Sequence, residues 1–215
     1  MEKQILDVWV NREAISPIIG VILMLLLTVL LAGITVSAVY GDDMVSSLKE
    51  APMASIEVEH VDGGLPKYPT YVGYKKNFLY LDHMGGDPLP ADSIRLIISG
   101  DGSSYSGVFG SGTTLYGDLI ITYDDLMFEG KIPKYASRNP CLSDGVWSTG
   151  ESLVLNGDDS INGTSASSVY VSINGITETS NNYGLEEDTW ITVKIFDKDT
   201  QRIISESECY VSLVK

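Results

Sequence analysis

Hydrophobic residues first gather in one long uncharged stretch, which runs from Ala14 to Gly41 after a short charged leader. A helix needs roughly 20 apolar residues to span a bilayer, and the removable core of a signal peptide is usually about 7–15 residues long. The stretch exceeds both lengths. Its first part, Ile18 to Leu27, has no polar face, which is typical of a helix in lipid or in a buried bundle. The pattern therefore predicts a helix that spans a membrane or forms the core of an assembly.

The start of this helix is predicted at Ser16 and Pro17. Serine is a good N-cap, and proline fits the first helical position because its missing N–H would have no partner there. Proline also disfavours helical geometry in the residue before it. We therefore expect the Ala14–Ile15 bond to lie in extended chain that a peptidase can reach.

Small residues recur every four positions near the end of the stretch, at Gly33, Ser37 and Gly41. This spacing places them on one helix face, where small side chains let helix backbones approach closely in lipid. The alternative is that glycine is simply common in membrane helices. Both interpretations stay open at this point.

The small residue Ala14 stands before the apolar stretch rather than after it. A secretory signal is cut after its hydrophobic core, so the core is lost. A peptidase that cuts between Ala14 and Ile15 would instead keep the helix, which must then be buried in a membrane or against other copies. Lys3 and Arg12 precede the stretch and Asp42 follows it, which favours a cytoplasmic N-terminus.

After residue 50 the pattern changes to short runs in which apolar and polar residues alternate with period two, as half-buried strands do. Clusters of Gly, Asp, Asn and Pro separate these runs and predict turns. We expect an all-β, antiparallel, immunoglobulin-like β-sandwich. The region 99–137 is rich in Gly, Ser and Tyr, and we expect long loops there with one or two edge strands. The predicted strands are residues 55–61, 77–81, 93–98, 152–155, 168–173, 189–195 and 208–213.

The formal net charge is −15 at pH 7. Such a chain is not suited to nucleic acid, because a nucleic-acid binder needs a basic patch to neutralise phosphates. The acidity instead favours a soluble domain, and this is a simpler explanation than an acidic ligand site.

Two cysteines and one sequon are candidates for covalent modification. Cys141 and Cys209 can form a disulfide if the domain is extracellular, and two buried free thiols are the alternative. Asn162, in Asn162-Gly163-Thr164, is a possible N-glycosylation site in a turn-like stretch.

We predict no catalytic, cofactor-binding or metal site. His83 and Asp87 flank Gly85-Gly86, but a tight turn explains this spacing better than acid–base or metal chemistry. None of the acidic pairs has the spacing of an EF-hand loop, so calcium would need oxygens from separate loops. The chain also has no nucleophile elbow and no phosphate-binding loop with lysine, so we expect no enzyme. The acidic pairs are Asp124-Asp125, Asp158-Asp159 and Asp197-Lys198-Asp199.

The run from Ala14 to Met24, Ala-Ile-Ser-Pro-Ile-Ile-Gly-Val-Ile-Leu-Met, resembles the N-terminal signature of archaeal type IV pilins. Bacterial pilins carry Glu at the position of Ile19, so this residue fits the archaeal branch. The resemblance implies a class III signal peptide at 1–14, cut by a membrane prepilin peptidase between Ala14 and Ile15. It also implies a helix and connector at 15–50 and an extracellular domain at 51–215. The residues expected in a filament core are Ile18, Ile19, Gly20, Val21, Ile22, Leu23, Met24, Leu25, Leu26, Leu27, Gly33 and Ser37.

The family also implies partners and location. A homo-oligomeric helical filament would be built by an assembly ATPase and a membrane platform, with the precursor in the cell membrane and the adhesive pilus on the cell surface. Residues 83–89 and 147–153 resemble turn motifs of archaeal pilin ectodomains. A minor pilin or adhesin, an archaellum subunit, and a membrane-anchored binding module with an uncut helix remain alternatives, although the run from Ser16 to Gly20 resembles the pilins better than the archaellins.

Overall fold

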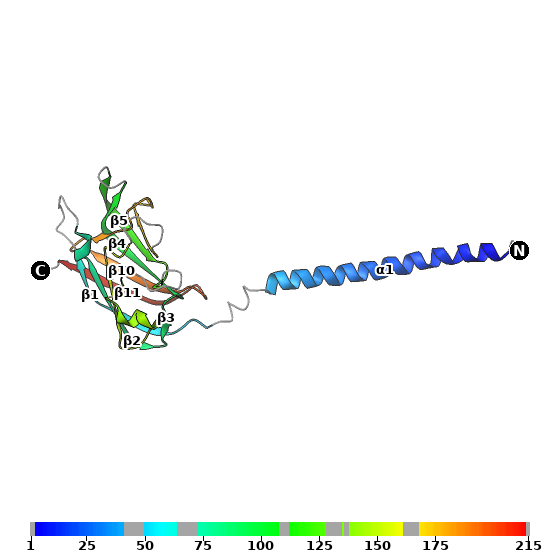
Figure 1. Ribbon diagram of the computed structural model, residues 1–215, viewed down its shortest axis with the longest axis horizontal. Helices are drawn as coiled ribbons and strands as arrows, with labels where there is room; N and C mark the ends of the chain where they lie inside the picture. The colour runs from blue at the N-terminus through cyan, green and yellow to red at the C-terminus, as the bar shows by residue number, and fades with distance from the viewer. Residues whose placement is uncertain are drawn as a thin grey trace. The chain divides into compact units, whose positions relative to one another are not determined.

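The computed structural model of the chain describes residues 3–40, 50–63, 73–107, 112–127, 135, 138–160 and 168–213. The chain divides into two compact units, Met1–Lys49 and Glu50–Lys215. The first unit contains the helix α1, Lys3–Tyr40, and the second contains the strands (Figure 1). Asn162 and Gly41 lie outside the described residues.

The second unit is a β-domain with two short 3₁₀ turns, at Tyr74–Lys76 and Pro140–Ser143. Most of its strands pair into one nine-stranded sheet, and β3 and β6 form a separate two-stranded sheet. The strands are β1 Ala54–Gly63, β2 Phe78–Gly86, β3 Leu89–Pro90, β4 Ile94–Ser106, β5 Thr113–Tyr123, β6 Val146–Trp147, β7 Ser152–Asn156, β8 Val169–Ile173, β9 Gly184–Leu185, β10 Trp190–Asp197 and β11 Arg202–Leu213.

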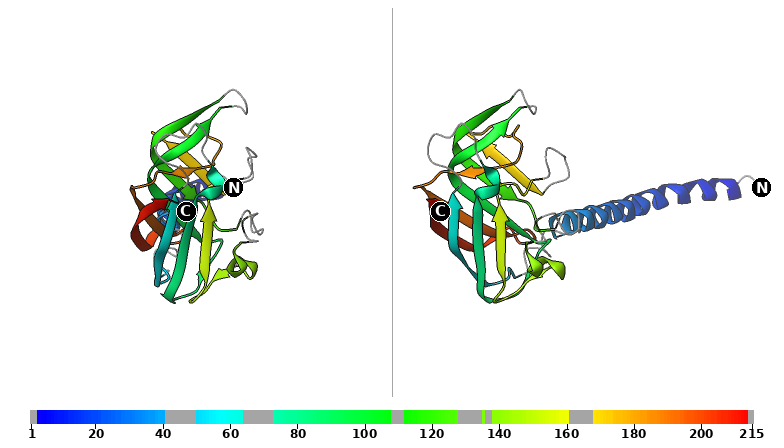
Figure 2. Two further views of the ribbon diagram at one scale, coloured as in Figure 1. Left: turned by 90° about the vertical axis from the view of Figure 1, so that its left-hand side faces the viewer. Right: turned by 60° about the vertical axis from the view of Figure 1, so that its left-hand side comes forward.

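The large sheet has the order β7-β2-β1-β11-β10-β4-β5-β8, and β9 pairs with β4. Its described pairs are antiparallel except for β1 with β11, which run parallel with Val61 opposite Val211. This parallel pair joins the two halves of the sheet, which curls around its buried side (Figure 2). The layers of the sandwich are therefore two halves of one continuous sheet.

One hydrophobic core fills the space inside the curl. Residues of β2 and β7 from one half and of β4, β5 and β10 from the other belong to the same buried cluster. Along β10 the period-two pattern is explicit, because Ile191, Val193 and Ile195 are buried and alternate with more exposed residues. Burying each such side chain stabilises the fold by roughly 1.5–3 kcal/mol before conformational entropy is counted.

On each outer strand of the sheet, polar side chains bind the backbone N–H and carbonyl groups of the central residue. On β7, the Asn139 amide accepts from the Val154 N–H at 2.6 Å and donates to the Val154 carbonyl at 2.9 Å. On β8, the Val171 N–H donates to Asn181 Oδ1 at 3.0 Å, and Thr179 Oγ1 donates to the Val171 carbonyl at 2.8 Å. These bonds occupy the backbone groups to which another strand would otherwise pair.

The predicted architecture, one apolar helix followed by an all-β and mostly antiparallel domain, is confirmed. Each of the seven predicted strands corresponds to a strand of the large sheet: β1, β2, β4, β7, β8, β10 and β11. The expectation of long loops after residue 99 was wrong, because β4 continues to Ser106 and forms a long hairpin with β5. Gly102 is needed inside this hairpin, since a side chain there would collide with the carbonyl oxygen of Gly184.

Candidate functional site

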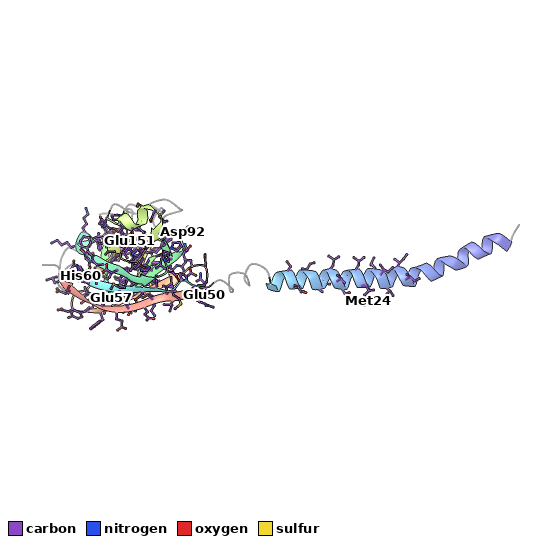
Figure 3. All side chains as sticks on the ribbon, turned by 90° about the horizontal axis from the view of Figure 1, so that it is seen from below. Met24, Glu50, Glu57, His60, Asp92 and Glu151 are labelled. Carbon is purple, nitrogen blue, oxygen red and sulfur yellow. The ribbon has the colours of Figure 1, made fainter. Side chains whose placement is uncertain are left out.

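The first functional feature is the apolar surface of α1. The segment Ile18–Ser37 has a mean hydropathy of 2.8 and is long and apolar enough to cross a membrane. Its large hydrophobic side chains are all exposed, from 54% at Ile22 to 70% at Met24, which is labelled in Figure 3. So much contiguous apolar surface is unfavourable in water. This segment therefore requires lipid or other protein surfaces around it.

The hydroxyl groups of α1 are compatible with an apolar surrounding. Thr28 Oγ1 donates to the Leu25 carbonyl at 2.9 Å, and Thr35 Oγ1 donates to the Ala32 carbonyl at 2.9 Å. Both threonine hydroxyls are thus satisfied within the helix, as an apolar surrounding requires. Gly33 has open space around it, and Ser37 follows one turn later on the same face.

The helix begins earlier than the predicted start at Ser16 and Pro17. It begins at Lys3 and includes the Ala14–Ile15 bond, which we expected in extended chain. Proline inside a helix removes only one backbone hydrogen bond directly, here to the Glu13 carbonyl, and long helices tolerate this at a cost of about 3 kcal/mol. The proline therefore marks a weak point inside α1 rather than its first turn.

The second feature is the point where the chain enters the β-domain, which we call the entry clamp and define by Met53, Gly86 and Asp87. The Met53 N–H donates to Asp87 Oδ2 at 3.0 Å, and the Asp87 N–H donates to the Met53 carbonyl at 2.8 Å. Gly86 has a φ of +105°, and any side chain there would collide with the Met53 carbonyl oxygen. This pair of bonds holds the start of β1 against the end of β2.

The two predicted turn motifs, at 83–89 and 147–153, pack against each other, and the first of them contains Gly86 and Asp87 of the entry clamp. His83 is buried, with Nε2 at 3.0 Å from the Asp87 carbonyl oxygen and Nδ1 at 3.4 Å from Thr149 Oγ1. The Trp147 ring meets the His83 ring edge-on, with 5.7 Å between centroids. The Gly150 N–H donates to the His83 carbonyl at 2.7 Å. His83 thus has partners on both ring nitrogens and supports the turn.

The acidic pairs mostly meet basic side chains. Arg95 Nη2 lies 2.6 Å from Asp124 Oδ1, and Lys198 Nζ lies 3.4 Å from Asp125 Oδ2. Asp197 accepts from the Thr200 N–H at 2.9 Å and closes a turn. Within the described ranges, no three His, Cys, Asp or Glu side chains gather at a point where they could hold a metal ion.

A buried polar cluster around Asp159 was not anticipated from the sequence. Asp159 Oδ2 accepts from Tyr123 Oη at 3.0 Å and from the Asn156 N–H at 2.7 Å, and Oδ1 meets the Arg138 guanidinium. Burial raises the pKa of Asp159, although Arg138 opposes this shift. Tyr123 Oη in turn lies 2.9 Å from Tyr183 Oη. The cluster joins β5 to the segments after β7 and before β9.

The cysteines are both free thiols in the structure, so the possible Cys141–Cys209 disulfide is not formed there. Cys141 donates from Sγ to the Ser152 carbonyl of β7, the outermost strand on its side. Cys209 lies on β11, and β2 and β1 stand between β11 and β7. Because neighbouring strands lie about 4.8 Å apart, this placement exceeds the reach of about 7 Å between the Cα atoms of a disulfide.

Comparison with known proteins gives two findings. Residues 13–56 match the family model described as archaeal type IV pilin, N-terminal. An uncharacterized protein of Archaeoglobus fulgidus is 33% identical over 90 residues, which cover 42% of this chain and 55% of the relative. The chain therefore spans about half the length of the curated relative that it matches. The family match includes the whole run from Ala14 to Met24 on which the resemblance was based.

Proposed function

Because residues 13–56 match the N-terminal domain of archaeal type IV pilins, we propose that this chain is the structural subunit of an archaeal type IV pilus. It polymerises through α1 into an extracellular filament that attaches the cell to surfaces. The observation that carries the proposal is the exposed apolar surface of Ile18–Ser37. A helix of this kind suits two successive surroundings, first lipid and then the helices of other subunits.

Processing would occur between Ala14 and Ile15, and the prepilin peptidase would remove residues 1–14. In the structure this bond lies inside α1, so cleavage requires local unwinding. Pro17 lowers the cost of this step, because it cannot donate to the Glu13 carbonyl and it disfavours helical geometry at Ser16. The weak point in α1 thus coincides with the expected processing site.

Assembly would transfer α1 from the bilayer into a bundle of identical helices. Lipid and neighbouring helices are about equally apolar, so the hydrophobic effect contributes little to this transfer. Close packing, helped by small residues such as Gly33 and Ser37, and work from an assembly ATPase on a membrane platform would drive it. Release of a subunit into water would expose every one of these side chains, at roughly 1.5–3 kcal/mol each, which supports a durable filament.

The proposal assigns no catalysis to the β-domain. His83 would serve the turn beside the entry clamp, since both of its ring nitrogens already have partners. Asp87 and Met53 would hold the domain to the chain that leads from the helix. The domains would then form the outer surface of the filament.

The test compares protein from sheared surface filaments with protein from membranes by intact mass and N-terminal sequencing. A mature chain that begins at Ile15 and is enriched in the sheared fraction would support the filament subunit. A chain that still begins at Met1 and stays in membranes would contradict it, and would leave the membrane-anchored binding module. Substitution of Ala14 by a bulky residue should hold the precursor in the membrane, whereas Ala91→Val, at an alanine buried in the β-domain, should leave cleavage after Ala14 unchanged.

A further inference from the structure

Four aromatic side chains form a row across the outer face of the sheet, which we call the aromatic stripe: Trp190, Tyr210, His60 and Tyr80. Trp190 and Tyr210 are cross-strand partners on β10 and β11, with ring centroids 5.5 Å apart. His60 and Tyr80 are cross-strand partners on β1 and β2, stacked at 3.9 Å. Trp190 is 64% exposed and Tyr210 is 44% exposed. Contiguous exposed apolar patches, rather than single exposed side chains, mark interaction surfaces, and these two rings lie side by side.

The two aromatic pairs share one face because of the parallel pairing of β1 and β11. Val61 and Val211 are register partners and both are buried, so they point into the core. Residues that precede them by one position, His60 and Tyr210, point to the opposite side. With about 4.8 Å between strands, the stripe extends about 14 Å across four neighbouring strands. This length fits an extended chain better than a single small molecule.

Carboxylates border the stripe on both sides. Tyr210 Oη donates to Asp188 Oδ1 at 2.9 Å, and this bond raises the pKa of Tyr210. The His60 ring nitrogens lie 3.7 Å from Glu59 Oε2 and 3.9 Å from Asp62 Oδ2. Burial, followed by the charges of Asp62 and Glu59, also raises the pKa of Tyr80. The phenols of Tyr210 and Tyr80 thus experience a negative potential.

The stripe lies far from the entry clamp within the domain. Figure 3 shows His60 and Glu50 at opposite ends of the β-domain. β1 begins at Ala54, beside the clamp, and reaches His60 about 20 Å further along, at about 3.3 Å per residue. His60 and the entry clamp therefore lie at different ends of the domain.

We propose that the aromatic stripe binds a glycan whose sugar rings carry protonated amino groups. The apolar C–H faces of sugar rings pack on exposed Trp and Tyr, and a cation over an aromatic ring gains further attraction. The carboxylates complement the amino groups and repel anionic glycans. They also disfavour a second copy of this chain as the occupant, since each copy has a net charge of −15. The inference rests on the proposed adhesive function and names its ligand class.

The test uses the full chain in lipid nanodiscs and isothermal titration with three oligosaccharides of equal length. These are a glucosamine oligomer, its fully N-acetylated form and a polyuronate. At pH 6 and low salt the glucosamine oligomer should bind, the acetylated form should bind at least about tenfold more weakly, and the polyuronate should not bind. Equal affinity for the first two, or preference for the polyuronate, would overturn the proposal, and so would stronger binding of a polylysine peptide.

Variants separate the stripe from general surface effects. Trp190→Ala should weaken binding about tenfold or more, and Asp188→Asn should weaken it and reduce its salt dependence. Tyr170→Ala is the matched control, because Tyr170 is a 53% exposed aromatic residue on β8, away from the stripe, and it should bind like the wild type. Unchanged binding by Trp190→Ala would refute the site. Sheared filaments of Trp190→Ala that begin at Ile15 would show that assembly is independent of this ligand, so the two proposals fail separately.

Discussion

The entry clamp gives a quantitative prediction through Gly86. Its φ of +105° is a conformation that residues with a side chain rarely adopt, and an alanine methyl group there would collide with the Met53 carbonyl oxygen. Gly145 is the matched position, because its φ is +79° but open space surrounds it. Gly145→Ala therefore introduces backbone strain alone, whereas Gly86→Ala introduces strain and forces Met53 away from Asp87.

The expected magnitudes follow from these contacts. Backbone strain at a left-handed position costs about 1–2 kcal/mol in either variant. Displacement of Met53 also breaks its two hydrogen bonds with Asp87, which contribute about 0.5–1.5 kcal/mol each. Gly86→Ala should thus lower the free energy of unfolding by about 2–5 kcal/mol, and Gly145→Ala by about 1–2 kcal/mol.

Urea unfolding of the full chain in detergent, followed by the β-sheet circular dichroism signal, measures both free energies. Hydrogen exchange at the amides of Met53 and Asp87 reports the clamp locally, and it should accelerate only in Gly86→Ala. If Gly86→Ala were no more destabilising than Gly145→Ala, with both amides still protected, the clamp would not hold the entry of the chain as described.

Three further predictions address the helix, a sheet edge and a buried acid. Leu26→Asp places a charge in the apolar segment and should abolish membrane insertion and filament formation, so normal sheared filaments from this variant would contradict the proposed function. Asn139→Ala leaves both backbone groups of Val154 without their partner, so it should cost about 2–4 kcal/mol in urea unfolding and promote aggregation; unchanged stability and aggregation would contradict the role given to Asn139. Burial raises the pKa of Asp159 above its ordinary 3.8, so the folded state binds this proton more readily than the unfolded state. As the pH falls from neutral towards 4, the stability of the wild type should therefore rise relative to Asp159→Asn, and equal pH slopes in the two proteins would refute the assignment.

The strands of the β-domain were predictable because their burial is periodic and local. Val193 and Ile195, for example, alternate with polar neighbours in the sequence as they do in the sheet. The hairpin of β4 and β5 was missed because glycines such as Gly102 usually indicate turns. Here the glycine instead makes room for the backbone at Gly184, a contact between positions far apart in the chain.

The sites were less predictable than the strands, for the same reason. The sequence identified His83 and Trp147 only as parts of separate turn motifs, and nothing local shows that the motifs meet. The aromatic stripe depends on the parallel pairing of β1 with β11, which brings His60 beside Tyr210 from opposite ends of the domain sequence. The buried position of Asp159 likewise follows from tertiary packing, since in the sequence it belongs to an ordinary acidic turn.

The blocked outer strands affect how such domains behave when many copies are packed closely together. Along a polymer, every domain has neighbours of identical sequence permanently close by, which is the situation in which open sheet edges fuse irreversibly. Asn139 on one side and Asn181 with Thr179 on the other remove that hazard at a cost of three polar side chains. In the proposed filament, crowded domains could then slide, tilt and separate as the fibre bends, and the fibre would keep its flexibility instead of hardening into a single cross-linked sheet.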